Sequence, residues 1–316
     1  MFELRFRRAI ALLSLDASAC AASPTAPAAP TKRKATATEK AASDAGYQAF
    51  GLPILLPKLR LMPDLETSRG VVLSTNEGEL SLYGRMRLRV STTGVIERAV
   101  RATKDFFALP EGVKRRHHIA GGGGQRGYIP FGVEAAKGAD KVDLKEFWHV
   151  GRELSDDHHY RAFMPPNVWP AEIATFREDV YGLYAALDAL GLELLESIAI
   201  FLELPRDFFR VPVRDGNSVL RLLHYPPTPP KPEGVRAEAH EDINVITLLL
   251  GAEEAGLQLL TREGEWLEVN PPEGALVVNV GDMLQRLTNH RLRSTTHRVV
   301  NPTPERAHLP RYSIPF

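Results

Sequence analysis

Three residues in the last third of the chain carry side chains that could bind one metal ion. His240 and Asp242 are two positions apart, and His297 follows later. In a β-strand, residues i and i+2 point to the same face, so an imidazole and a carboxylate could meet at one point. Two histidines and one carboxylate, with other coordination positions left open, suit non-haem Fe(II) that activates O₂. The sequence therefore predicts an iron site at His240, Asp242 and His297.

Arg311 and Ser313 repeat this spacing close to the end of the chain. A guanidinium group offers paired N–H donors and a hydroxyl adds one more, so together they could bind a carboxylate. Arginine suits this task because it is planar and stays charged. We therefore predict a site for an organic acid beside the metal.

Other acidic and histidine residues are not predicted as ligands. Glu241 should point away from the metal. His290 lies seven residues before His297 and is not predicted as a ligand. The histidine pairs at 117–118 and 158–159 lie in polar, charged stretches, so we expect them at the solvated surface.

The elements that must position these residues are short strands. After Asn217, apolar runs alternate with turn signals rich in proline and glycine, a pattern typical of a β-sandwich or barrel. The expected strands are 219–223, 245–250, 257–260, 266–269, 275–280, 295–300 and 312–316.

Two helices are expected before the strands. Apolar residues recur near helical spacing over 94–109, where Leu109-Pro110 ends the pattern. A wide apolar stripe predicts a long helix over 171–202, ended by Pro205. We interpret this stripe as core packing.

Composition limits the class of protein. The chain has 316 residues, 44% of them hydrophobic, and 39 basic residues balance 39 acidic ones. A balanced charge predicts no nucleic-acid or membrane partner, and no apolar run is long enough to span a bilayer. The only cysteine, Cys20, excludes an internal disulfide and fits a reducing compartment. The sequence does not specify an oligomeric state, and we expect a monomer.

The first ninety-three residues follow a different pattern. Arginines, a short apolar stretch and small residues before Cys20 resemble a lipoprotein signal, but Asp16 interrupts the apolar stretch, so we expect a cytoplasmic protein. Residues 21–46 are rich in Ala, Pro, Thr and Lys. We therefore predict a disordered or signal-like tail at 1–46 and an atypical segment at 47–93 without a recognisable strand pattern. A helical part at 94–214 and a jelly-roll part at 215–316 should follow.

The chain from about Gly94 resembles the isopenicillin N synthase-like family of Fe(II)/2-oxoglutarate-dependent dioxygenases. The resemblance covers DFFALP at 105–110, GQRGY at 124–128, DLKEFW at 143–148, PNVWP at 166–170, LRLLHYPP at 220–227, NVGD at 279–282 and THRVV at 296–300. A lone His-x-Asp pair is common in proteins. Followed by His297 within the THRVV segment and then by Arg311-x-Ser313, the pair is specific for this family.

The resemblance implies a mixed α/β (α+β) fold with a double-stranded β-helix, or jelly roll, braced by helices. It implies that His240, Asp242 and His297 bind Fe(II), that Arg311 and Ser313 bind the distal carboxylate of 2-oxoglutarate, and that Tyr225 lies near this cosubstrate. O₂ is the third reactant. Oxidation, by hydroxylation, of a small organic substrate would accompany decarboxylation of 2-oxoglutarate to succinate.

The resemblance leaves the substrate open. It places Gln125, Arg126, Tyr128 and Trp148 where family members often line the pocket, although a structural role fits each equally well. Two alternatives to the 2-oxoglutarate-dependent enzyme remain. One is a cosubstrate-free iron oxidase of the isopenicillin N synthase type, and the other is an inactive, truncated jelly-roll binding module.

Overall fold

The fold is described from a computed structural model. It describes residues 70–74, 82–85, 92–134, 142–229, 232–250, 254–269 and 276–316, with backbone only for 70–74, 82–85 and 92–93. The expectation for the tail at 1–46 and most of that for 47–93 lie outside these residues. Within the described residues, no helix has both the length and the apolar character needed to cross a bilayer.

A major sheet of eight strands forms the centre of the fold, in the order β2-β1-β10-β7-β12-β5-β4-β3. Its strands are β1 (Gly70–Ser74), β2 (Leu82–Arg85), β3 (Gly127–Ile129), β4 (Glu146–Gly151), β5 (Val219–Tyr225), β7 (Ile246–Leu250), β10 (Leu276–Val280) and β12 (Arg311–Pro315). A minor sheet has the order β6-β11-β8-β9. Its strands are β6 (Ala237–His240), β8 (Leu257–Leu260), β9 (Trp266–Glu268) and β11 (His297–Val299).

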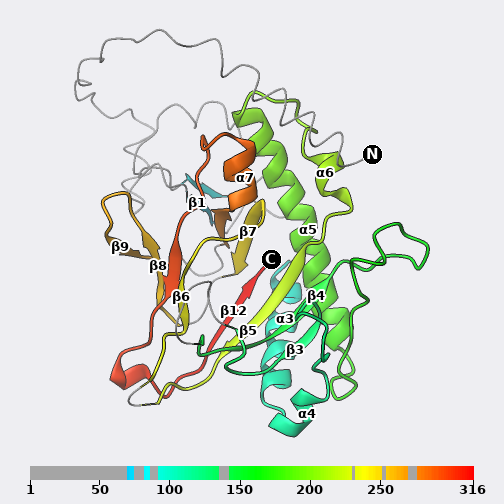
Figure 1. The fold of residues 1–316 in the computed structure, drawn as a ribbon, viewed down its shortest axis with the longest axis vertical. Coiled ribbons are helices and arrows are strands. Elements are labelled where there is room, and N and C mark those ends of the chain that lie inside the picture. Colours follow the sequence, from blue (N-terminus) through cyan, green and yellow to red (C-terminus); the bar gives the residue numbers. More distant parts are fainter. Residues whose placement is uncertain are drawn as a thin grey trace.

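Helices cover the face of the major sheet that is turned away from the minor sheet (Figure 1). They are led by α3 (Thr92–Phe107) and α5 (Phe176–Phe201). The apolar stripe of α5 packs on Trp148, Leu222 and Ile314, which lie in the largest buried cluster. This helix begins at 176 rather than 171, because residues after Pro170 form turns. The shorter elements are α4 (Glu111–Arg115), α6 (Arg210–Arg214), α7 (Asp282–Leu287) and the 3-10 helix η2 (Pro304–Arg306).

The two sheets face each other across a second, smaller core. Leu249 and Val277 of the major sheet pack there on Ala237, Leu257 and Val299 of the minor sheet. Paired sheets with helices on one outer face form the architecture expected for a helix-braced jelly roll.

The structure corrects several expectations about the strands. β3, β4 and β6 were not predicted, and β1 and β2 lie within the segment at 47–93, where no strand was expected. β1 pairs in parallel with β10, so this segment does extend the major sheet. β3 and β4 also belong to this sheet, so the segment at 94–214 supplies strands as well as helices.

Candidate metal and carboxylate site

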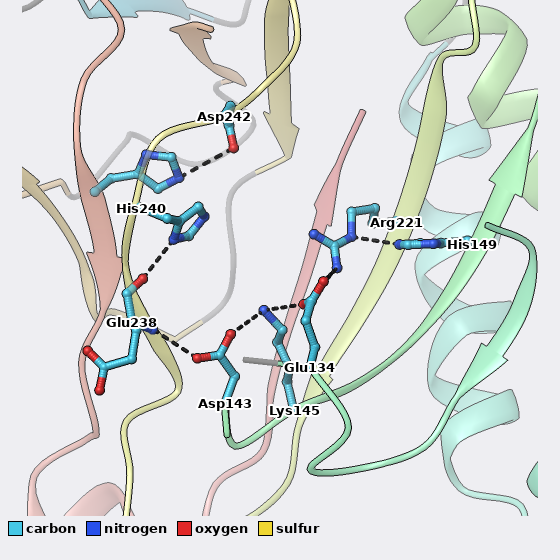
Figure 2. A network of polar contacts seen from close by, with 9 residues as sticks. Glu134, Asp143, Lys145, His149, Arg221, Glu238, His240 and Asp242 are labelled. Atoms are coloured by element: carbon cyan, nitrogen blue, oxygen red, sulfur yellow. Dashed lines mark hydrogen bonds and ion pairs between the residues drawn. The ribbon is translucent and has the colours of Figure 1, made fainter. Parts of the chain in front are cut away.

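The structure brings His240, Asp242 and His297 together. His240 ends β6 and pairs directly with His297, the first residue of β11. One ligand atom from each of the three residues lies within 4.8 Å of the others, and His297 Nε2 is 3.8 Å from Asp242 Oδ1. Asp242 lies beyond the end of β6, in the loop to β7, so His240 and Asp242 do not share one strand as predicted. The loop, not strand alternation, turns its carboxylate toward the imidazoles (Figure 2).

Backbone carbonyl groups orient both imidazole rings. His240 Nδ1 lies 2.7 Å from the carbonyl oxygen of Glu238, and His297 Nδ1 lies 3.0 Å from that of Thr295. A carbonyl can only accept, so each Nδ1 carries the hydrogen and each Nε2 keeps its lone pair for a metal. Burial, and then the nearby His297, lower the pKa of His240, which favours the neutral form that metal binding needs.

Asp242 is held by its own loop. Thr247 Oγ1 donates to Asp242 Oδ2 over 2.6 Å, and Asn244 Nδ2 donates to Thr247 Oγ1 over 2.7 Å. The backbone N–H of Asp282 donates to the carbonyl of Asp242 over 2.7 Å. A side chain at Gly281 would overlap Asn244, so only glycine allows α7 to begin this close to the loop. One carboxylate oxygen, Oδ1, remains directed at His297.

We predict that Thr247→Val weakens metal binding without unfolding the protein. Valine has nearly the same shape but cannot donate to Asp242. Loss of such an outer contact should lower metal affinity about 10-fold or more. Calorimetric titration with Mn(II) measures this, with Thr261→Val as the control because Thr261 contacts only a surface turn. Equal affinities in the two variants would contradict the role given to Thr247.

The donor set fits a divalent iron ion. Two neutral imidazole nitrogens and one carboxylate oxygen converge from one side, which is the set that suits non-haem Fe(II). The neighbouring Glu241 is exposed and accepts a hydrogen bond from Thr296 Oγ1 over 2.9 Å, so it points elsewhere. His290 is also exposed and has a φ of 62°, a left-handed conformation. Neither residue belongs to the metal-ligating group.

Strand register places the predicted carboxylate-binding residues on the inner face of the major sheet, which is the face turned toward the minor sheet. Arg311 pairs with Tyr225, and Ser313 pairs with Leu223. Directly paired residues of antiparallel strands share a face, and every second residue of a strand returns to it. Pro315 pairs with Leu249, which packs on the minor sheet. Arg311, Ser313 and Tyr225 therefore face the sheet that carries His240 and His297.

Arg311 is deeply buried and has unused hydrogen-bonding capacity. Its side chain is 3% exposed, its Nε donates to the carbonyl of Glu254 over 3.1 Å, and its Cζ lies 5.2 Å from the centre of the Tyr225 ring. Among the residues that the structure describes, no atom accepts a hydrogen bond from its Nη1. Burial lowers the pKa of Arg311, but a guanidinium group starts so high that it remains charged. A carboxylate would fit this environment.

The four residues expected to line the substrate pocket lie in different environments. Tyr128 pairs with Trp148 on the outer face of the major sheet, where both are fully buried in the core beneath the helices. Arg126 packs against Gly151 and donates to Asn217, and Gln125 is exposed. We therefore assign Tyr128 and Trp148 to the core, and a place in the pocket for Gln125 and Arg126 stays a prediction. β4 is buried on both faces, so its sequence lacks the alternation that would have distinguished inner from outer residues.

The inner-face positions that sequence analysis missed are Phe147 and His149. They alternate with Glu146 and Trp148 and pair with Leu223 and Arg221 of β5. The guanidinium group of Arg221 lies over the Phe147 ring, with Cζ 4.6 Å from its centre. Arg221 Nε donates to His149 Nε2 over 2.7 Å, which requires a neutral imidazole. Burial, followed by the charge of Arg221, lowers the pKa of His149 to about 3, consistent with this neutral form.

A chain of charged residues continues from Arg221 toward the metal ligands (Figure 2). Glu134 accepts from Arg221 Nη2 over 2.8 Å and lies 2.7 Å from Lys145 Nζ. Burial alone would raise the pKa of Glu134, but Arg221 and Lys145 outweigh it and lower that pKa to about 2. Lys145 also donates to Asp143, whose other oxygen accepts the backbone N–H of Glu238. Glu238 is the residue whose carbonyl orients His240, so this network contacts the metal site from outside.

Comparisons with known proteins agree with this geometry. Residues 216–316 match the 2OG-Fe(II) oxygenase superfamily, and residues 90–172 match the family described as non-haem dioxygenase in morphine synthesis N-terminal. The 2-oxoglutarate-Fe(II) type oxidoreductase hxnY of Emericella nidulans is 37% identical over 231 residues, which are 69% of this chain and 65% of that protein. The chain thus spans slightly less than two thirds of the length of this relative.

Solved structures show the same likeness. A 2OG-Fe(II) oxygenase family protein from Caulobacter crescentus is 60% identical, with a TM-score of 0.65 over 71% of this chain and 72% of that one. A full-length protein of Neurospora crassa, crystallised in complex with alpha-KG, is 32% identical, with a TM-score of 0.62 over 72% of this chain and 70% of that one. The jelly-roll fold and the mixed α/β class are thereby confirmed.

Proposed function

Because this chain belongs to the 2OG-Fe(II) oxygenase superfamily, we propose that it is an Fe(II)- and 2-oxoglutarate-dependent dioxygenase that hydroxylates a small organic substrate. The observation that carries the proposal is the position of two sites on facing sheets. The three candidate ligands converge at the minor sheet, and Arg311 and Ser313 lie on the inner face of the major sheet opposite.

Each residue has a defined task in this proposal. His240, Asp242 and His297 hold the iron, and Arg311 and Ser313 bind the distal carboxylate of 2-oxoglutarate beside Tyr225. When bound, iron supplies the activation of O₂ that couples conversion of 2-oxoglutarate to succinate and CO₂ with insertion of one oxygen atom into the substrate. The buried inner face excludes water from the reacting groups.

The substrate would meet the inner face beside Arg221 of β5 and Glu134. Arg221 and Glu134 are partly exposed charged groups there, with 28% and 34% of their side chains accessible, and the buried Phe147 ring lies beneath the Arg221 guanidinium group. Two partly exposed groups of opposite charge suit a small, polar molecule that both donates and accepts hydrogen bonds. The Neurospora crassa protein was also crystallised with thymine, so pyrimidine bases belong among the candidates to test.

A turnover assay tests the proposal. The purified protein is supplied with Fe(II), 2-oxoglutarate and O₂, and succinate is measured for pyrimidine bases, amino acids, small peptides, and phenolic or terpenoid acids. We expect at least one class to stimulate succinate formation. A protein that binds neither iron nor 2-oxoglutarate would contradict the proposal and favour a binding module.

We predict that Arg311→Lys raises the 2-oxoglutarate concentration needed for half-maximal turnover. Lysine keeps the charge but cannot bind a carboxylate through two parallel N–H donors. A lost charged hydrogen bond corresponds to about a 10- to 100-fold change. Iron affinity, measured by titration, should stay nearly unchanged. Unaltered 2-oxoglutarate dependence would favour the cosubstrate-free oxidase.

We also propose that the enzyme acts in the cytoplasm on a small molecule. The single cysteine fits a reducing compartment. Both Fe(II) and 2-oxoglutarate would be accessible there.

A further inference from the structure

A second arginine is buried beside Arg311. Arg236 immediately precedes β6, is 1% exposed and is among the largest fully buried side chains. Its Nη2 donates to the carbonyl of Leu309, just before β12, over 3.1 Å. Its Cζ lies 6.0 Å from the centre of the Tyr225 ring, the same ring that Arg311 approaches at 5.2 Å. The two guanidinium groups therefore share one aromatic neighbour between the sheets.

These two cations have no anion in contact within the described part of the chain. Nε and Nη1 of Arg236 and Nη1 of Arg311 are buried without a hydrogen-bond acceptor there. The negative charge of Glu254 raises the pKa of both arginines, but its carboxylate pairs with the exposed Arg306 over 2.6 Å. Burial lowers the pKa of Arg236, and the charge of Arg311 lowers it further. Two adjacent buried charges with unused donors are unfavourable unless an anion joins them.

We propose that Arg236 and Arg311 form one anion pocket, in which Arg236 supplies a second guanidinium group to the distal carboxylate of 2-oxoglutarate. This inference rests on the proposed function. A carboxylate has two oxygens with about four acceptor sites, enough for Arg311, the hydroxyl of Ser313 and Arg236 together. Arg311, which the sequence predicted, then carries only one of the two positive charges in the pocket.

The pocket also defines which ligands the protein prefers. An oxo acid with a second carboxylate neutralises part of the buried charge, whereas 2-oxobutyrate, which lacks that carboxylate, cannot. Arg236 should therefore act as a specificity-determining residue for dicarboxylates. It should also reduce the stability of the ligand-free protein, because its charge is then unpaired.

The test compares Arg236→Met with Arg126→Met. Arg126 is the matched control because it is also buried, at 2% exposure, with an Nε that has no acceptor among the described residues, but it packs against Gly151 at the far end of β4. Mn(II)-loaded protein is titrated calorimetrically with 2-oxoglutarate and with 2-oxobutyrate, and the melting temperature is measured without ligand. Arg236→Gln is measured alongside, since glutamine can still donate to Leu309.

We expect both Arg236 variants to lose at least about 10-fold in affinity for 2-oxoglutarate and to keep their affinity for 2-oxobutyrate. The melting temperature of ligand-free Arg236→Met should be equal to or above that of the wild type, and Arg126→Met should bind 2-oxoglutarate normally. Unchanged 2-oxoglutarate affinity, or an equal loss for both ligands with a lower melting temperature, would show that Arg236 is only structural. If the wild type itself fails to bind 2-oxoglutarate, the proposed function fails first. If Arg311→Met loses this binding and the Arg236 variants keep it, only the present inference fails.

Discussion

Replacing Asp242 with asparagine is expected to remove metal-dependent turnover. The amide has no negative charge to balance the divalent ion, and it disturbs the hydrogen bond that Asp242 accepts from Thr247. Loss of an outer partner already lowers metal affinity about 10- to 100-fold, so loss of a direct ligand should exceed this. Titration with Mn(II) and succinate formation with Fe(II) measure the two effects.

The adjacent carboxylate provides the control for this prediction. Glu241 is exposed and contacts Thr296, so Glu241→Gln should bind metal and turn over as the wild type does. The same contrast applies to the histidines: His297→Ala should lose the metal, and His290→Ala should keep it. If Glu241→Gln or His290→Ala proved to be the damaging change, the assignment of ligands would have to be abandoned.

The largest effect on stability is expected from Glu146, on the outer face of β4. Its carboxylate is buried and accepts hydrogen bonds from Lys114 Nζ over 2.8 and 2.7 Å and from the hydroxyl of Tyr128. It also lies 2.7 Å from His224 Nδ1. Glu146→Gln would remove the buried counter-ion of Lys114 and leave its ammonium group only the half-exposed Glu111, 3.3 Å away. Breaking one side of a buried ion pair lowers the free energy of unfolding by about 3–5 kcal/mol.

Urea unfolding at neutral pH measures this loss. Glu153→Gln is the control, because Glu153 pairs with Arg177 at the surface and such pairs contribute only about 0–1 kcal/mol. A small loss for Glu146→Gln, similar to that of the control, would contradict the prediction. The variant should still bind metal, since Glu146 faces the helices and not the minor sheet.

The same carboxylate gives stability a pH dependence. Burial by itself would raise the pKa of Glu146, but the hydrogen bonds involving His224, Lys114 and Tyr128 outweigh it and hold the pKa below its usual range. A group whose pKa is lower in the folded state stabilises the protein above its unfolded pKa, and this stability is lost as the pH falls. Glu146→Gln should remove that contribution.

Residue types and their spacing were sufficient to predict the candidate metal ligands and to recognise the family. The side chains of His240, Asp242 and His297 have the donor atoms that Fe(II) accepts. Their spacing and the surrounding sequence predicted that these side chains lie close together. The long helix and most strands after 217 were also predictable. The helix carries a wide apolar stripe, and the strands are short apolar runs separated by turn residues.

Which residues face the pocket became evident only in the folded chain. β4 is buried on both faces, so its sequence could not separate Trp148, which packs on the helices, from Phe147, which lies on the inner face. β6 has the unremarkable sequence Ala-Glu-Ala-His and is a strand because it pairs with β11. No sequence pattern around Arg236 predicted a binding role for it. Its role follows from being buried next to Arg311 with unused donors, and burial and proximity between distant segments arise only when the chain folds.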